Sequence, residues 1–276
     1  MVRTSSVTAD PDDIQALVDE TIRFLTVRPE GDRWVGDTPL WFGDQLFGGF
    51  LVAQAVHAAT RSAPEGKRIH SLHAYFLRPA RAAQPLFYRV TTLREGRTLT
   101  TRSVEATQGD ASVFSMTCSF SADTEGYEYE LPLGREARGP DDVPQTQGPG
   151  AWIAADVGPT PAEPDGTRRS THRHWFRMPG ALPDDPHIHA ALLAFATDWT
   201  GIGGRPLHLD GDTTGMVSLD HAVWFHRPAR ADAWHLYDVH SLINTGGRGV
   251  LRGTIHDIDR RLVVSVAQEM LLRPIR

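Results

Sequence analysis

Two segments of this 276-residue chain carry nearly the same sequence. SLHAYFLRPAR spans residues 71–81, and DHAVWFHRPAR follows 149 positions later, at residues 220–230. A second pair, VFSMTCSF at 113–120 and VVSVAQEM at 263–270, lies 150 positions apart. Two copies are too few for a solenoid, which needs three or more stacked repeats. The chain is therefore predicted to be a duplicated domain, and positions where the copies differ become the candidates for function.

The composition is that of a globular protein that can bury a core. Hydrophobic residues make up 40% of the chain and charged residues 22%. The net charge of −6 gives no overall attraction to nucleic acid or to an anionic membrane. The single cysteine, Cys118, excludes an intrachain disulfide and fits a reducing compartment. Since neither a signal peptide nor an apolar run of membrane-spanning length is present, we expect a cytoplasmic protein without nucleic-acid or membrane partners.

Each copy is predicted to contain one buried helix and an antiparallel sheet. Residues 48–59 open with two glycines and continue almost wholly apolar, and residues 187–199 repeat this pattern in the second copy. Residues 69–120 contain strand-like runs separated by EG and GD turns, which predicts an antiparallel meander. A further amphipathic helix is expected over residues 12–27. Helix and sheet segregated in this way indicate the α+β class.

The composition divides the chain into three parts. Residues 1–120 and 171–276 hold the two copies. Between them, residues 121–170 are dominated by Pro, Gly, Asp and Glu and carry few apolar residues. Such a segment buries too little apolar surface to order itself, so we expect an exposed, partly mobile connector.

The strings FGG, HSLHAYFLRP, LREGR, LDHAVWFHRP and AQE, in this order, resemble the type II acyl-CoA thioesterases, the TesB-like family. The resemblance covers roughly residues 41–120 and 175–273. It implies a double hotdog, in which each copy's sheet wraps its helix and the two sheets pair side by side. It also implies hydrolysis of fatty acyl-CoA to a free acid and CoA without a metal or redox cofactor, by a homo-oligomer (dimer or tetramer).

In that family an aspartate, a serine or threonine, and a glutamine hold the attacking water. The strings AFATDWT, VSLDH and AQEM place these residues at Asp198, Ser218 and Gln268. The chain departs from the family pattern at positions that bear on acyl-chain preference more than on the chemistry. These positions are Phe50, Ala222, Val223 and Met270.

The residues themselves support such a site. Asp198 lies in an apolar helix, where burial raises the pKa of a carboxyl group. Gln268 shares a strand face with apolar neighbours, so it is expected to point toward the helix. Attack of water on a thioester needs a base or a polar cradle, together with donors for the developing oxyanion. The backbone amides of Gly48 and Gly49, at a helix start, are candidates for those donors.

The repeat provides an independent argument. Ser218 corresponds to Ile69 and Gln268 corresponds to Cys118, while the first helix has no acidic residue between positions 48 and 60. Any one of these polar residues alone is more simply explained as a satisfied buried group. All three occur in the second copy and none in the first, which favours catalysis.

Two alternatives remain open. Asp220 and His221 could serve as the acid–base pair of a hotdog enoyl-CoA hydratase, although a structural role is favoured for Asp220, whose repeat counterpart is Ser71. The chain could also be a module that binds acyl-CoA without turnover.

Other candidates are weaker. Cys118 is more simply a buried small residue than a nucleophile. The H-x-H pairs at 172–174 and 187–189 lack a third metal ligand. Several arginines could bind CoA phosphates, but ordinary solvated roles explain them equally well. They are Arg78, Arg81, Arg97, Arg227, Arg230 and Arg248.

Overall fold

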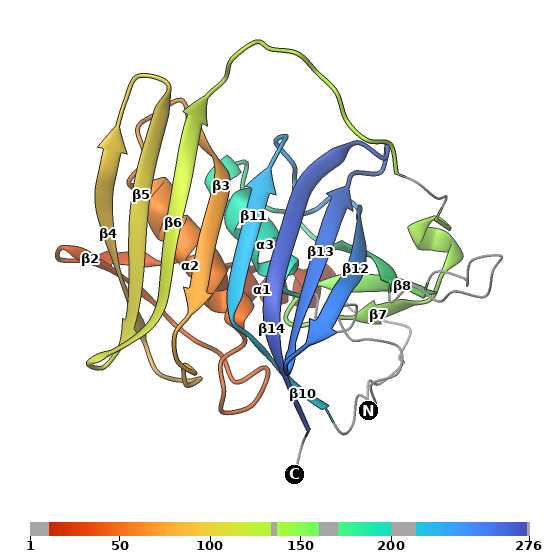
Figure 1. Cartoon of the computed structure of the whole chain (residues 1–276), viewed down its shortest axis with the longest axis horizontal. Coiled ribbons are helices and arrows are strands. Elements are labelled where there is room, and N and C mark those ends of the chain that lie inside the picture. The colour runs from red at the N-terminus through yellow and green to blue at the C-terminus, as the bar shows by residue number, and fades with distance from the viewer. Residues whose placement is uncertain (1–10, 134–136, 160–170, 200–213, 275–276) are drawn as a thin grey trace.

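The computed structural model describes residues 11–133, 137–159, 171–199 and 214–274. One sheet runs through both copies, and the helices lie behind it (Figure 1). Within the described residues it has fourteen strands, with the order β1-β2-β4-β5-β6-β3-β11-β14-β13-β12-β9-β8-β7 and β10 paired with β14.

The elements follow the predicted repeat. The helices are α1 (Pro11–Leu25), α2 (Gly48–Arg61) and α3 (Pro186–Asp198), with a 3-10 turn at Pro140–Asp142. The strands of the first copy are β1 (Arg28–Glu30), β2 (Arg33–Gly36), β3 (Lys67–Phe76), β4 (Leu86–Glu95), β5 (Leu99–Gln108) and β6 (Ala111–Ala122). The remaining strands are β7 (Gln145–Gln147), β8 (Ile153–Pro159), β9 (Thr171–Arg177), β10 (Thr214–Ser218), β11 (Asp220–Phe225), β12 (His235–Thr245), β13 (Arg248–His256) and β14 (Leu262–Pro274). All three predicted helices form within two residues of their expected bounds.

The two copies join through a symmetric strand pair. β3 and β11 are the corresponding strands of the repeat, and they lie antiparallel at the centre of the sheet. His73 is paired with Ala222, its own repeat counterpart, 149 positions later. The pairs on either side are related in the same way, since Ser71 faces Trp224 and Tyr75 faces Asp220. A pseudo-twofold axis therefore passes through the His73–Ala222 pair.

A β-bulge is repeated in both copies. In the first copy, Ile69 pairs with Phe120 and Ser71 with Ser119, which leaves His70 as the extra residue. In the second copy the corresponding residue is Leu219, which separates β10 from β11. A bulge redirects the side chains beside it, and in the second copy it directly follows Ser218.

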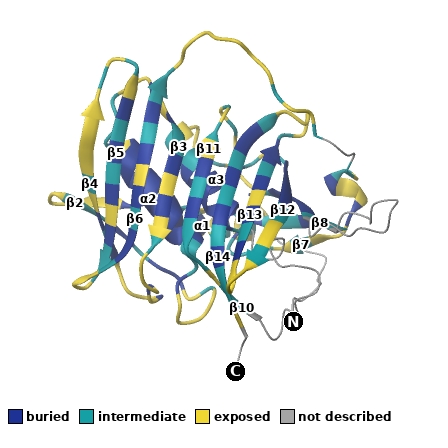
Figure 2. Cartoon of the chain, in the orientation of Figure 1, coloured by how far each residue is buried: buried dark blue, intermediate teal, exposed yellow. Residues whose placement is uncertain are grey.

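The central helices pack closely against each other. Gly49 through Thr60 of α2 are all buried (Figure 2). The rings of Phe50 and Phe195, one from each helix, lie 5.1 Å apart. A Cβ at Gly49 would lie only 3.0 Å from the Phe195 carbonyl oxygen. A glycine at this position therefore allows the start of α2 to reach the end of α3.

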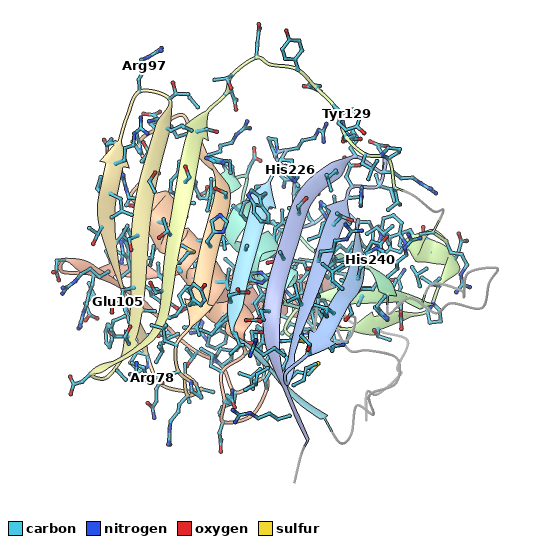
Figure 3. The ribbon with its side chains drawn as sticks, viewed as in Figure 1. Arg78, Arg97, Glu105, Tyr129, His226 and His240 are labelled. Atoms are coloured by element: carbon cyan, nitrogen blue, oxygen red, sulfur yellow. The ribbon has the colours of Figure 1, made fainter. Side chains whose placement is uncertain are left out.

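The segment expected to be an exposed connector is only partly so. Tyr127 and Tyr129 are exposed, as expected, and Tyr129 lies on an arch beyond the sheet (Figure 3). However, β7 and β8 extend the second copy's sheet, and Trp152 is fully buried. The Trp152 ring stacks on Phe195 at 6.3 Å. The composition did not indicate this because few apolar residues, among them Val143, Ala151, Trp152 and Ala155, provide the burial in a segment otherwise rich in Pro, Gly, Asp and Glu. In the part of the chain that the structure describes, no helix is long and apolar enough to cross a membrane.

Gln54 connects α2 to the segments that precede it. Its Nε2 donates to the carbonyl oxygens of Phe24 (2.6 Å) and Asp37 (2.7 Å), and its Oε1 accepts from the Tyr88 hydroxyl at 2.8 Å. Gln54→Leu removes all three bonds and leaves their partners in an apolar core. We expect a loss of about 3 kcal/mol in unfolding free energy, measured by urea denaturation. Gln15→Leu, which removes exposed hydrogen bonds, is the control and is expected to cost less than about 1 kcal/mol. Equal losses in both variants would contradict this role for Gln54.

Candidate active site

Three polar side chains predicted from the sequence meet in one cluster. Asp198 ends α3, Ser218 ends β10, and Gln268 lies within β14. The Gln268 Nε2 donates to Asp198 Oδ1 at 2.6 Å and to Ser218 Oγ at 2.6 Å. The Ser218 hydroxyl in turn donates to Asp198 Oδ1 at 3.3 Å. The structure therefore brings all three predicted residues into direct contact.

Strand register explains why Ser218 and Gln268 meet. Ser218 pairs with Met270 across β10 and β14, while Ala222 pairs with Ala267 across β11 and β14. The bulge at Leu219 accounts for the extra residue on the β10–β11 side. Gln268 lies two residues from Met270 and so projects from the same face of β14. Both Gln268 and Met270 are buried.

The Asp198 carboxyl group is almost completely removed from solvent. Its residue is 3% exposed. Burial raises its pKa to about 7, against the opposing effect of hydrogen bonds from Gln268, Ser218 and the Gly49 backbone. A carboxyl group with a pKa near neutrality exists in both protonation states at pH 7. This is the property that a general base needs.

The start of α2 supports this carboxylate. Gly49 belongs to the first copy, and its backbone amide lies close enough to Asp198 to lower the pKa of the carboxyl group. A Cβ on Gly48 would lie 2.7 Å from Asp198 Oδ2 and equally near the Phe76 ring. The sequence suggested both glycine amides as oxyanion donors. In this structure the Gly49 amide lowers the pKa of the Asp198 carboxyl group, and the oxyanion role of these amides stays a prediction.

The cluster lies at the wall of a cavity, which we call the Asp198 cavity. Its volume is about 350 Å³. Asp198 and Ser218 line it, together with mainly apolar side chains from both copies. These include Phe47, Leu51, Phe76, Val217 and Met270. A small molecule with an apolar portion could therefore reach Asp198 and Ser218.

Comparison with known proteins agrees with this organisation. Residues 38–121 match the family described as acyl-CoA thioesterase N-terminal domain, and residues 131–272 match the acyl-CoA thioesterase C-terminal domain. The chain is also 32% identical to acyl-CoA thioesterase 2 of Haemophilus influenzae over 256 residues, which cover 83% of this chain and 88% of that protein. The chain belongs to the acyl-CoA thioesterase II family. It is further 29% identical to human acyl-coenzyme A thioesterase 8, with 95% of this chain and 91% of that protein covered.

Solved structures of the family share the fold. The crystal structure of acyl-CoA thioesterase II TesB2 from Mycobacterium marinum matches with a TM-score of 0.80 and 33% identity, covering 92% of this chain and 98% of that one. The tesB protein of Mycobacterium avium subspecies paratuberculosis matches with a TM-score of 0.78 and 29% identity, covering 96% and 100%. The α+β double hotdog predicted from the sequence is thereby confirmed.

His221 is a supporting residue that the sequence did not assign to the thioesterase site. It is 1% exposed, and its Nε2 lies 2.7 Å from the Thr197 hydroxyl, which itself donates to the Ala194 carbonyl. Burial lowers its pKa to about 3, so the ring is neutral at pH 7. Through Thr197, His221 therefore fixes the end of α3 next to Asp198.

The hydratase alternative receives no support from this geometry. Asp220 Oδ1 accepts the Glu269 backbone N–H at 2.7 Å, which is a structural role within the sheet. Asp220 and His221 are also neighbours in one strand, so their side chains point to opposite faces. The favoured reading of Asp220 as a structural residue is consistent with this contact.

The cysteine and the histidine pairs do not form a second reactive site. Cys118 is 1% exposed, and burial raises the pKa of its thiol to about 12, so the reactive thiolate is scarce. His174 is buried with a pKa lowered to about 3, and its neighbour His172 contacts Asp156 at 3.2 Å. Across the described ranges, no group of three or more His, Cys, Asp or Glu could hold a metal ion.

The candidate CoA-binding arginines lie in different parts of the molecule. Arg78 lines the Asp198 cavity, whereas Arg97 lies at the opposite end of the sheet, in the β4–β5 turn (Figure 3). Arg248 is paired with Glu269 at 2.9 Å. Arg227 and Arg230 line a different cavity. Of these arginines, Arg78 is therefore the one placed beside Asp198.

The raised pKa of Asp198 predicts a pH-dependent stability. A carboxyl group with a raised pKa holds its proton more tightly in the folded state than in the unfolded state. The wild-type protein should therefore lose stability relative to Asp198→Asn as the pH rises from about 4 to about 7. The difference should grow by up to about 1.4 kcal/mol per pH unit. Urea denaturation at several pH values measures it, and a difference that is independent of pH would contradict the raised pKa.

Proposed function

We propose that this protein hydrolyses fatty acyl-CoA to a free fatty acid and CoA, with Asp198, Ser218 and Gln268 holding the attacking water. One observation carries the proposal. Three mutually hydrogen-bonded polar groups, all from the second copy, meet at the wall of a mainly apolar cavity. Membership in the acyl-CoA thioesterase II family supports the same reaction.

The proposed reaction uses the carboxylate as a base. Water beside Asp198 transfers a proton to the carboxylate as its oxygen attacks the thioester carbonyl carbon. The resulting tetrahedral oxyanion collapses, the carbon–sulfur bond breaks, and the CoA thiolate leaves. The proton held by Asp198 then passes to the leaving sulfur. The products are the carboxylic acid and the CoA thiol, and the enzyme returns to its starting state.

Gln268 and Ser218 have positioning roles in this proposal. The Gln268 amide and the Ser218 hydroxyl fix one carboxylate oxygen and offer further polar contacts for water. Holding base and water in a fixed geometry lowers the entropic part of the barrier.

The proposal also covers the cellular location and the oligomeric state of the enzyme. A cytoplasmic location is supported by the free, buried thiol of Cys118, which fits a reducing compartment. A homo-oligomer is proposed by analogy with the family. Tyr75 and Trp224, on the two central strands, are 62% and 36% exposed, and exposed aromatic residues on a sheet face are common in interfaces.

Release of CoA thiol tests the function. The wild-type protein is incubated with short-, medium- and long-chain acyl-CoAs, and free thiol is followed over time. Asp198→Asn should lower kcat by about 10²- to 10⁴-fold, the usual contribution of a general base. Cys118→Ala is the control and should retain activity, because its thiol is buried and protonated.

Two outcomes would contradict the proposal. If no chain length releases CoA from the wild-type protein, the thioesterase assignment is wrong. If folded Asp198→Asn hydrolyses acyl-CoA at the wild-type rate, the base lies elsewhere.

A further inference from the structure

A second cavity of about 600 Å³ lies at the other end of the helix pair. We call it the second cavity. The helices are antiparallel, since the start of α2 reaches Asp198 at the end of α3. Correspondingly, the start of α3, with Pro186 and His187, lines the second cavity. His226, at its wall, and Arg78, at the Asp198 cavity, lie toward opposite ends of the sheet (Figure 3).

The walls of the two cavities are repeat counterparts. Residues 76–80 line the Asp198 cavity, and residues 225–229 line the second cavity. The two corresponding arginines, Arg78 and Arg227, also make equivalent hydrogen bonds. Arg78 donates to the Ser112 carbonyl and Arg227 to the Leu262 carbonyl, each at 2.7 Å. The pseudo-twofold axis therefore relates the cavities as well as the strands.

The second cavity lacks the chemistry of the first. Ile69 lines it at the position that corresponds to Ser218. The counterpart of Gln268 is Cys118, which pairs with Arg102 in the sheet. The buried Arg102 guanidinium donates to the Ser62 carbonyl, just beyond α2. Arg102, paired with Glu95 at 2.8 Å, thus lies near the end of α2, whereas a carboxylate ends α3, so among the described residues the second cavity has no counterpart of the Asp198, Ser218 and Gln268 cluster.

A buried hydrogen-bond donor nevertheless belongs to a residue in the wall of this cavity. His189 lines the second cavity and is 4% exposed. Its Nδ1 accepts the Ala231 backbone N–H at 3.2 Å, so in the neutral ring the proton is on Nε2. Within the described residues, this Nε2 has no hydrogen-bond partner. A buried donor of this kind suits a carbonyl oxygen supplied by a ligand.

Three arginine side chains, each paired with a carboxylate, line the second cavity. Arg230 contacts Asp184 at 2.6 Å, with side-chain exposures of 47% and 95%. Arg227 is paired with Glu130 at 2.7 Å, and Arg68 contacts Asp123. Arg230 also contacts Asp232 at 3.0 Å. The Arg230–Asp184 and Arg68–Asp123 pairs are exposed and contribute little stability, so a phosphate group can replace Asp184 and Asp123.

We propose that the second cavity binds a second acyl-CoA molecule without hydrolysing it. The inference rests on the proposed function, because acyl-CoA is the ligand assigned to the symmetry-related Asp198 cavity. The thioester carbonyl is placed against His189 and the CoA phosphates against the arginines that line the cavity. Free CoA, the reaction product, carries the same phosphates and pantetheine arm as acyl-CoA. The experiment below distinguishes binding of acyl-CoA from binding of free CoA.

Binding stoichiometry tests the proposal. Isothermal titration uses a 2-oxoalkyl-CoA, which keeps a carbonyl group but cannot be hydrolysed. We expect two molecules per wild-type chain and one in Ala190→Trp, which fills the second cavity from α3. Hydrolysis of dilute acyl-CoA by Ala190→Trp should stay within about twofold of wild type. Titration with free CoA shows whether the head group alone fills the second cavity or the acyl chain is required.

A matched pair of surface variants tests the proposal independently of whether Ala190→Trp folds. Arg227→Glu should weaken only the second-cavity site, about tenfold, and its repeat counterpart Arg78→Glu should weaken only the Asp198 site. One ligand per chain in a wild-type protein that hydrolyses acyl-CoA would overturn the proposal. So would an unchanged second site in both Arg227→Glu and folded Ala190→Trp. Failure of the proposed function is recognised separately, by the absence of thiol release.

Discussion

The buried carboxylate of Asp198 is the interaction on which the candidate site depends. Burying an ionisable group costs several kcal/mol unless hydrogen bonds compensate. Here Gln268 and Ser218 from the second copy donate to it, and the Gly49 amide from the first lowers its pKa. The compensation is incomplete, and the pKa remains raised to about 7. The same imbalance that costs stability leaves a carboxylate able to accept a proton at neutral pH.

The duplication explains how such a site could arise in one half only. His73 and Ala222 mark a pseudo-twofold axis, and both copies keep the bulge after Ile69 and Ser218. Each copy therefore directs the residue before its bulge toward the core, as Ile69 in one and Ser218 in the other. The polar residues of the cluster lie around the end of α3 in the second copy, while the first copy contributes the glycines at the start of α2 that approach it. The site needs both copies, although its side chains come from one.

Sequence reasoning identified the repeat, the three helices and the cluster of Asp198, Ser218 and Gln268. These features depend on local periodicity and on differences between the copies, which a single sequence displays. It did not predict the burial of Trp152 or the contact of His221 with Thr197, because both depend on contacts between segments far apart in the chain. The effect of the Gly49 amide on the pKa of Asp198 also depends on the antiparallel placement of α2 and α3, which local sequence patterns do not display.

The central claim is that the chemistry lies where the second copy departs from the first. The most direct test replaces both strand residues with their counterparts, Ser218→Ile and Gln268→Cys together, and measures thiol release from acyl-CoA. Asp198 then loses two donors, which favours its protonated form. The account predicts that thiol release falls at least about 100-fold, the lower range for loss of a general base, while the cooperative urea transition persists. Hydrolysis near the wild-type rate in the folded double variant would contradict it.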